Sequence, residues 1–174
     1  MRFCSDCGAA VKRARPDGDD LDRDICTACG KIHYQNPKLV VGAVCEWEGK
    51  ILLCRRAIEP RSGFWTIPAG FMELNESTEE GAIRETMEEA NARIEITDLL
   101  AIYSIARLSQ VQIFYRAKMI SPDFKAGIET EELDLFSIED IPWDDLAFPT
   151  VHWILKKAIE VRNQPVPFFP DLRG

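Results

Sequence analysis

The sequence predicts an α/β protein with a mixed sheet and few helices, preceded by a small cysteine-bearing module. Two observations lead to this prediction. After residue 37, strand-like and helix-like stretches follow one another in the order β-β-β-α-β-β-β-α. Before residue 37, two Cys-x-x-Cys pairs enclose a segment that is too short and too charged to build a hydrophobic core. We therefore expect two domains, residues 1–36 and residues 37–174.

The first domain is predicted to be a zinc ribbon. Its four cysteines form two Cys-x-x-Cys pairs with 18 residues between them, Cys4 with Cys7 and Cys26 with Cys29. Four thiolates at this spacing suit tetrahedral Zn²⁺, whose binding supplies folding free energy on the order of 10 kcal/mol. The charged interior, residues 12–24, is expected to be a loop or two thin strands. We interpret His33 as a linker residue rather than a fifth ligand.

The second domain begins with a predicted β-hairpin. Residues 39–46 and 50–56 are β-type runs, and Trp47-Glu48-Gly49 is expected to form the turn between them. Cys45 and Cys54 lie inside these runs and are predicted to be small buried apolar side chains.

An acidic helix follows within residues 70–92. Ser77 or Thr78 can cap its start, and Ala82, Ile83 and Met87 are available for packing. This helix carries three glutamates at positions i, i+3 and i+4, namely Glu85, Glu88 and Glu89. Residues at this spacing are neighbours on a helix, so the three carboxylates share one face. Arg84 is expected to neutralise one of them at most. A hard divalent cation such as Mg²⁺, which takes oxygen ligands, would relieve the remaining repulsion.

The later part of the domain is predicted from apolar patterning. Strands are expected at residues 94–104, 111–120 and 133–136, and a last helix at residues 151–163. Trp153, Ile154 and Ala158 are expected to face inward on that helix. The tail is expected to be extended because it contains Pro165, Pro167 and Pro170.

The composition restricts the function classes. With 174 residues, of which 46% are hydrophobic, the chain can bury one core plus a small appendage. A net charge of −8 argues against nucleic-acid or membrane partners, but bound metal ions would still permit anionic substrates. No apolar run approaches the roughly 18 residues of a membrane span, and the first residues do not resemble a signal peptide. We therefore expect a cytoplasmic protein.

The acidic helix and the residues before it resemble the Nudix box, G-x5-E-x7-R-E-U-x-E-E-x-G-U, in which U is a bulky aliphatic residue. Six positions match: Gly70, Glu76, Arg84, Glu85, Glu88 and Glu89. The departures, at Thr86, Asn91 and Ala92, affect packing and the helix end rather than the charged set. Together with the cysteine pairs, these motifs resemble those of zinc-ribbon Nudix hydrolases, which implies a Nudix α/β/α sandwich behind the ribbon.

The resemblance implies an enzyme that hydrolyses the pyrophosphate bond of a nucleoside diphosphate linked to another moiety, of the FAD, ADP-ribose or NADH type. Its products are two phosphomonoesters. Mg²⁺ or Mn²⁺ is implied as the catalytic metal, and its expected ligands are Gly70, Glu85, Glu88 and Glu89. Arg84 would orient a glutamate, and Glu76 would pair with Arg84 or cap the helix.

A late loop and a strand end supply the remaining candidates. Nudix enzymes draw a ligand or a base from a late glutamate-bearing loop, and here the candidates are Glu129, Glu131 and Glu132, with Glu131 as the catalytic choice. Arg55 and Arg56 end a strand, where they either bind substrate phosphates or are simply solvated. Phe64 can stack on a ring of the substrate.

The substrate and the assembly stay open. The NADH-specific motif SQPWPFPxS is not present, and the nearest run, residues 104–110, departs from it almost throughout. One alternative is an RNA-cap or nucleoside triphosphate pyrophosphohydrolase, which the negative net charge disfavours. Another is a nucleotide-sensing binder without catalysis. The zinc ribbon can also form the interface of a homodimer.

Overall fold

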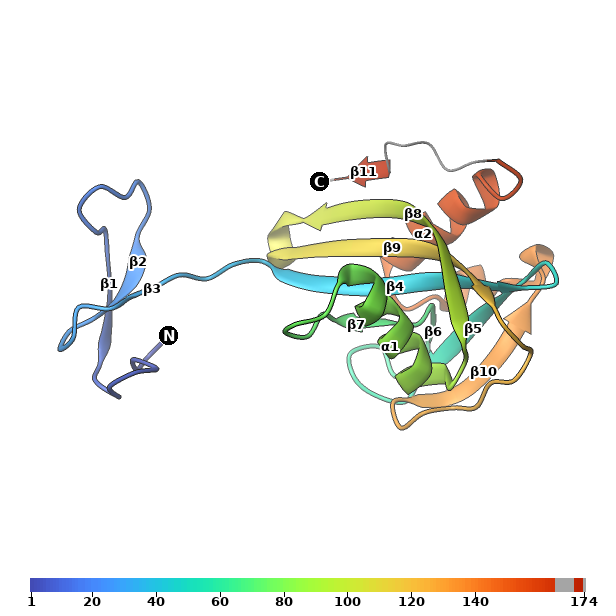
Figure 1. Ribbon diagram of the computed structural model, residues 1–174, viewed down its shortest axis with the longest axis horizontal. Coiled ribbons are helices and arrows are strands. Elements are labelled where there is room, and N and C mark those ends of the chain that lie inside the picture. The colour runs from blue at the N-terminus through green and yellow to red at the C-terminus, as the bar shows by residue number, and fades with distance from the viewer. Residues whose placement is uncertain (165–170, 174) are drawn as a thin grey trace. The chain divides into compact units, whose positions relative to one another are not determined.

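The structure, a computed structural model, describes residues 1–164 and 171–173. It consists of two compact units, Met1–Pro37 and Lys38–Gly174, and each has its own sheet (Figure 1). The tail expected around Pro165, Pro167 and Pro170 lies outside the described residues. None of the described helices combines the length and the hydrophobicity that a membrane crossing needs.

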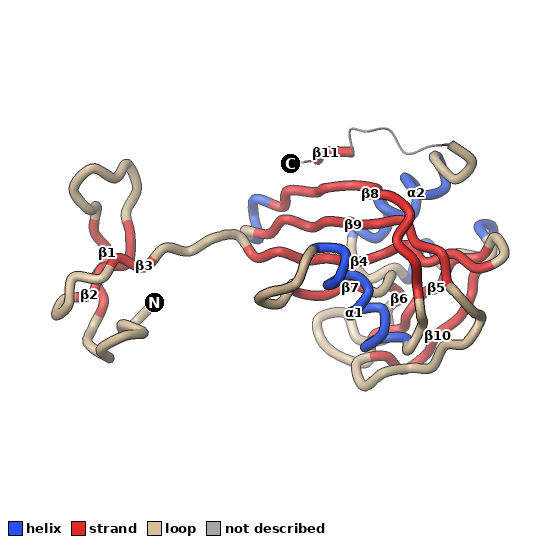
Figure 2. Tube along the Cα trace, in the orientation of Figure 1, coloured by secondary structure: helices blue, strands red, loops and turns tan. Residues whose placement is uncertain are grey.

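The N-terminal unit is a three-stranded antiparallel sheet in the order β1-β2-β3. Figure 2 shows its strands in red and the loops that join them in tan. Its strands are β1 (Val11–Ala14), β2 (Arg23–Cys26) and β3 (Ile32–His33). β1 and β2 are the thin strands expected around the charged interior. The interpretation of His33 as a linker residue is wrong, because it pairs with Asp24 of β2 and is buried. The sheet therefore continues beyond the second cysteine pair.

The second unit is built on a mixed sheet, as predicted. Six strands follow the order β10-β5-β4-β9-β8-β11, with β6 paired to β5 and β7 paired to β4. β4 runs parallel to β9 but antiparallel to β5 and β7. The strands are β4 (Lys38–Trp47), β5 (Lys50–Arg56), β6 (Trp65–Thr66), β7 (Ala69–Phe71), β8 (Ile94–Ile105), β9 (Gln110–Met119), β10 (Thr130–Phe136) and β11 (Asp171–Arg173).

The predicted hairpin is formed by β4 and β5. Trp47 pairs with Lys50, so the turn consists of Glu48 and Gly49 alone. Cys45 and Cys54 are 0% and 1% exposed, which confirms that they are buried apolar residues.

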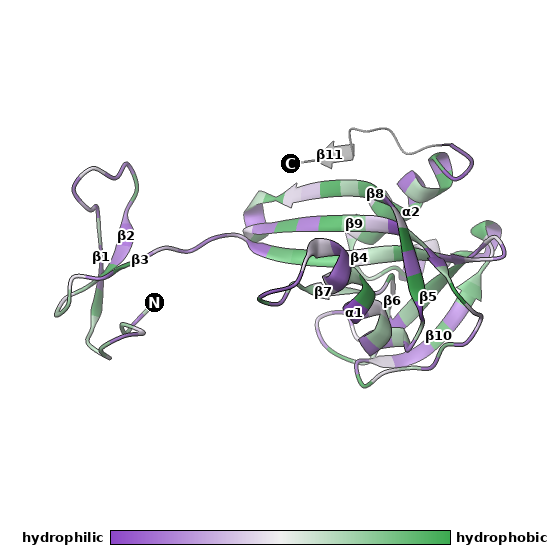
Figure 3. Cartoon of the chain, in the orientation of Figure 1, coloured by the Kyte–Doolittle hydropathy of each residue, from purple (hydrophilic) through white to green (hydrophobic). Residues whose placement is uncertain are grey.

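Two helices, α1 (Thr78–Ala90) and α2 (Pro149–Glu160), cover opposite faces of this sheet (Figure 1). Side chains alternate along β4, so Val41 packs in the apolar cluster that includes Ala82 of α1, whereas Val44 packs with Ile154 of α2. These three layers form the predicted α/β/α sandwich. α2 ends at Glu160, three residues before the expected end at residue 163. In Figure 3 α1 is largely hydrophilic, because it carries the acidic residues.

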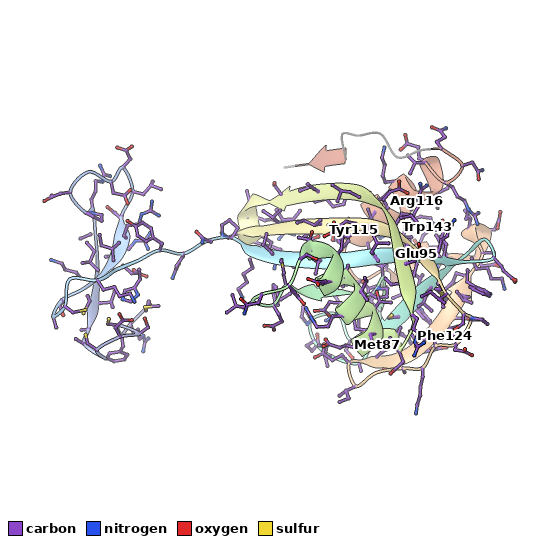
Figure 4. All side chains as sticks on the ribbon, viewed as in Figure 1. Met87, Glu95, Tyr115, Arg116, Phe124 and Trp143 are labelled. Carbon is purple, nitrogen blue, oxygen red and sulfur yellow. The ribbon has the colours of Figure 1, made fainter. Side chains whose placement is uncertain are left out.

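Local sequence fixes both ends of α1. The Ser77 hydroxyl accepts a hydrogen bond from the Glu80 N–H at 3.2 Å, and the Glu80 carboxylate accepts one from the Ser77 N–H at 2.7 Å. This pair is a capping box. Asn91 ends the helix in the left-handed conformation, which asparagine tolerates well. Tyr115 lies beside the first turn, with its hydroxyl 2.5 Å from that of Thr78 (Figure 4).

The packed face of α1 differs from the expected one. Ala82 is buried, but Ile83 and Met87 are each 38% exposed; Figure 4 labels Met87. Thr86 is fully buried instead, and its hydroxyl donates to the Ala82 carbonyl at 2.8 Å. Because small side chains face the sheet, α1 packs close to it.

Candidate functional site

In the N-terminal unit, the four cysteine sulfurs converge. All four Sγ atoms lie within 4.8 Å of one another. The Sγ–Sγ distances are 3.8 Å for Cys4–Cys29, 3.5 Å for Cys7–Cys26 and 3.6 Å for Cys7–Cys29. Tetrahedral Zn²⁺ with Zn–S bonds of about 2.3 Å needs sulfur separations of about 3.8 Å. The four cysteines therefore fit one zinc ion closely.

Backbone N–H groups favour the thiolate form of Cys26. The N–H groups of Cys29 and Ala28 donate to Cys26 Sγ, each at 3.4 Å, and lower the pKa of the Cys26 thiol to about 6. The Asp6 N–H donates in the same way to Cys4 Sγ at 3.4 Å. A zinc ligand must lose its proton, so these contacts prepare the site for the metal.

In the second unit, a cavity of about 1090 Å³ opens beside α1, β7 and the start of α2. Its wall includes four charged residues of α1, namely Arg84, Glu85, Glu88 and Glu89. β7 contributes its backbone through Ala69, Gly70 and Phe71. The structure thus brings together the helix glutamates and Gly70 that the sequence proposed as metal ligands.

Two of these glutamates are almost fully buried. Glu85 and Glu89 are each 8% exposed, and Glu89 Oε2 accepts a hydrogen bond from the Ala69 N–H at 3.2 Å. A Cβ at position 70 would overlap the Glu85 carboxylate, so a larger residue there would displace this carboxylate from its present position. Glu88 is exposed at the rim.

Burial changes the acidity of both carboxyl groups. Desolvation raises the pKa of Glu89 to about 8, and the Ala69 N–H only partly offsets this effect. Desolvation also raises the pKa of Glu85, against the opposing influence of Arg84. A bound divalent cation would favour the charged form of both groups. Carboxylate and carbonyl oxygens are the ligands that Mg²⁺ and Mn²⁺ take, so this donor set fits such an ion.

Arg84 contacts three carboxylates, where the sequence analysis expected it to neutralise one at most. Its Nε and Nη2 donate to the two oxygens of Glu76 at 2.9 and 2.8 Å. Its Nη1 donates to Glu85 at 2.8 Å and to Glu88 at 3.0 Å. The Arg84 contact lowers the pKa of Glu76 to about 2. Glu76 was expected either to pair with Arg84 or to cap the helix. In the structure it pairs with Arg84, and Ser77 caps the helix.

These hydrogen bonds keep the glutamate oxygens apart. Metal-binding side chains are those of His, Cys, Asp and Glu. In the described part of the chain, the four cysteines are the one group of three or more of these residues whose ligand atoms converge, all within 4.8 Å of one another. Glu85 and Glu88 instead bind Arg84, and Glu89 binds the Ala69 N–H. A metal ion would have to compete with these donors for the oxygens.

The late glutamates are not all in one loop. Glu131 and Glu132 lie on β10, where each pairs with Arg55 at 3.1 Å. Glu129 precedes the strand and lines the cavity, and its charge contributes to the raised pKa of Glu89. The structure therefore brings Glu129 to the site in the place expected for Glu131.

One of the three predicted substrate contacts lies at the cavity. Arg56 lines it, with its guanidinium 5.3 Å from the centroid of the Phe148 ring. Arg55 is instead engaged by the β10 glutamates. Phe64 lies outside the cavity lining and has Arg61 over its ring at 4.9 Å. The two neighbouring arginines separate because successive strand residues point to opposite faces.

Sequence reasoning missed several polar residues at this cavity, three of which lie on β9 or just before it. Gln110 and Gln112 of β9 line it, as does Arg107 in the short 3₁₀ turn η1 (Ala106–Leu108) before that strand. The signal was present in the sequence, because two glutamines at alternate positions of a strand share one face.

Comparison with known proteins covers both units. The family model described as Nudix N-terminal matches residues 2–35, and the model described as NUDIX domain matches residues 36–158. An ADP-ribose pyrophosphatase from Methanocaldococcus jannaschii is 31% identical over 113 residues, which are 63% of this chain and 67% of that protein. The NAD-capped RNA hydrolase NudC from Edwardsiella ictaluri is 26% identical over 167 residues, which are 91% of this chain and 59% of that protein.

A solved structure agrees more closely. The crystal structure of a NUDIX hydrolase from Nitrosomonas europaea matches with a TM-score of 0.94 and 52% identity, over 99% of this chain and 98% of that chain. The matched region spans between about half and two thirds of the length of the first curated relatives.

Proposed function

The chain belongs to the NUDIX family of hydrolases, and on this basis we propose that it cleaves the pyrophosphate bond of a nucleoside diphosphate linked to a second moiety. The products are two phosphomonoesters. The observation that carries this proposal is the pair of buried carboxylates, Glu85 and Glu89, at the wall of a large cavity. Burying two carboxyl groups side by side costs folding free energy, which a catalytic role explains.

We propose that these residues hold Mg²⁺ or Mn²⁺. Glu85 and Glu89 are the core ligands, and Glu88 and the Gly70 carbonyl support them. When bound, the metal neutralises charge on the phosphoanhydride and acidifies a water molecule.

The protein's own residues orient the reaction. Arg84 positions Glu85 and Glu88 through Nη1, and its two bonds to Glu76 fix the guanidinium in place. Glu129 is proposed as the base that accepts the proton of the attacking water, in place of Glu131, which the sequence favoured as the late catalytic glutamate, acting as ligand or base. Arg56 brings positive charge to an acidic cavity and is proposed to bind a phosphate oxygen.

ADP-ribose is the proposed substrate, ahead of FAD and NADH. The support is the similarity to the Methanocaldococcus jannaschii protein, which is named an ADP-ribose pyrophosphatase. NADH ranks last because the run that departs from the NADH motif includes Arg107 and Leu108, which line the cavity. The residues that differ from the NADH motif therefore lie where they can affect substrate binding.

Hydrolysis of NAD-capped RNA is a second candidate. The similarity to NudC from Edwardsiella ictaluri extends over 91% of this chain. The chemistry would be the same cleavage of a pyrophosphate bond. The net charge of −8 disfavours extended contacts to RNA, so this candidate ranks second.

The test is release of phosphomonoesters, after phosphatase coupling, from ADP-ribose, FAD, NADH, NAD-capped RNA and dinucleoside polyphosphates with Mg²⁺ or Mn²⁺. We expect the highest kcat/KM for ADP-ribose. A higher kcat/KM for NAD-capped RNA than for ADP-ribose would identify the capped RNA as the substrate instead. No turnover of any substrate by the zinc-loaded protein would reject hydrolysis and favour a nucleotide-sensing binder.

We further propose that the protein is cytoplasmic and forms a homodimer. The zinc ribbon is the proposed interface, because small metal modules often pack on a neighbour. Size-exclusion chromatography with light scattering tests the dimer, and a monomer at micromolar concentration would reject it.

A further inference from the structure

Gln112 carries a buried acceptor that the described protein groups do not use. Its Nε2 donates to Oε1 of Gln110 at 3.1 Å. Its own Oε1 is buried and has no hydrogen-bond partner among the described residues. Both glutamines line the cavity. A buried carbonyl oxygen without a donor costs free energy, so this oxygen is suited to a donor that arrives with a ligand.

The sheet register places Gln112 close to the proposed reaction centre. Val40 of β4 pairs with Gln112 on one side and with Phe71 on the other, and all three residues line the cavity. Neighbouring strands are about 4.8 Å apart, so Gln112 lies about 10 Å from Phe71. Phe71 follows Gly70, which faces the Glu85 carboxylate. This gap suits the sugar and phosphate that separate a nucleobase from a scissile anhydride.

The surrounding wall suits a planar ring. Phe114, two residues after Gln112 on the same face of β9, lines the cavity together with Leu108 and Trp153. The Trp153 ring packs edge-on against Tyr103, at 5.5 Å between centroids and 90° between planes. Apolar and aromatic walls with a few polar groups are typical of sites that bind ring-containing ligands.

We propose that Gln112, supported by Gln110, reads the edge of an adenine base. This inference rests on the proposed function and narrows its substrates to compounds linked through adenosine diphosphate. A glutamine amide matches adenine because its oxygen accepts from the exocyclic amino group while its N–H donates to a ring nitrogen. Nε2 of Gln112 has two N–H groups, and the bond to Gln110 uses one of them. Guanine and hypoxanthine present a carbonyl oxygen at the amino position, which would oppose Oε1.

The test compares binding of AMP and IMP in the presence of Mg²⁺ by isothermal titration calorimetry. We expect the wild-type protein to bind AMP about tenfold more tightly than IMP. Gln112→Leu should bring this ratio close to one. Gln35→Leu, at an exposed glutamine of the N-terminal unit, is the matched control and should leave it unchanged. An unchanged ratio in Gln112→Leu would overturn the inference.

A second variant guards against misfolding. Gln112→Glu keeps oxygen acceptors at this position, so it should retain a preference for AMP over IMP that Gln112→Leu loses. Melting temperatures check that each variant is folded. A wild-type protein that prefers AMP but hydrolyses neither ADP-ribose nor its inosine analogue would reject the proposed function and support the adenine site. Equal affinity of the wild-type protein for AMP and IMP would reject the adenine site whatever the turnover.

Discussion

The backbone N–H of Gly127 donates to the carbonyl oxygen of Glu89 at 3.0 Å. Two residues earlier, the Lys125 N–H donates to the Ala90 carbonyl at 2.8 Å. The segment before β10 therefore binds the C-terminal end of α1, where it satisfies carbonyl groups that a helix end leaves free. Glu129 reaches the cavity because its segment is held by the same helix that carries the other glutamates.

Gly127→Ala should displace Glu129. A Cβ at position 127 would overlap the Glu88 carbonyl oxygen, so the segment would have to move away from the helix. We expect kcat for ADP-ribose to fall about tenfold or more, since a general base contributes at least this much. Combining Gly127→Ala with Glu129→Gln should add little to Glu129→Gln alone, because both changes act on one carboxylate. Ala126→Ser is the control, and wild-type kcat in Gly127→Ala would contradict this role.

Arg84→Lys should lower both kcat and the melting temperature. The guanidinium binds three carboxylates and the Phe71 carbonyl at once, whereas an ammonium group lacks the planar fork that reaches both oxygens of Glu76. KM should change little, because Arg84 is proposed to position carboxylates rather than substrate. Steady-state kinetics and thermal melts measure these effects, with exposed Arg93→Lys as the control. Unchanged kcat would show that the guanidinium network is not needed.

Metal binding should release a proton at neutral pH. The folded metal-free protein holds a proton on Glu89 between pH 4.5 and about 8, whereas the unfolded chain has lost it above 4.5. Stability from this group therefore falls as the pH rises through that window. Because a metal ligand must be ionised, we expect Mn²⁺ binding at pH 7 to release about one proton, and clearly less at pH 9.

Calorimetry in buffers of different ionisation enthalpy measures this release. Glu89→Gln should abolish the difference between the two pH values. Equal proton release by the wild-type protein at pH 7 and pH 9 would contradict the raised pKa of Glu89.

We expect the protein to bind one zinc ion per chain and to need this ion for folding of the N-terminal unit alone. Cys26→Ser removes one of four converging sulfurs, so we expect loss of zinc and rapid proteolysis within residues 1–37. Cys45→Ala is the control, because Cys45 is buried in the second unit, where burial raises the pKa of its thiol to about 12. Full zinc content in Cys26→Ser would show that the ion is held elsewhere.

The features that the sequence predicted well depend on neighbouring residues. The two cysteine pairs, the Glu48-Gly49 turn and the start of α1 at Ser77 are each specified within a few positions. The place of Glu129 could not be predicted in this way. It depends on hydrogen bonds from Gly127 and Lys125 to a helix end that lies far away in the sequence.

The remaining differences have the same origin. The acidic run 129–132 predicts one loop, and on this basis Glu131 is the expected catalytic glutamate. However, β10 begins at Thr130, and Glu131 pairs with Arg55 instead. The sequence places Gln110 and Gln112 on one face of a strand, but the nearness of Gln112 to the acidic helix depends on the parallel pairing of β9 with β4, which sets Gln112 opposite Val40.

The most direct test of the proposed active site is kcat for ADP-ribose with Mg²⁺ in Glu89→Gln, beside Glu79→Gln as the control. Glu79 lies exposed in the first turn of the same helix, so its substitution should leave kcat near the wild-type value. Glu89→Gln should lower kcat by at least about a hundredfold, equivalent to about 2.7 kcal/mol. Near-normal turnover in Glu89→Gln would contradict the assignment of the buried glutamates as metal ligands.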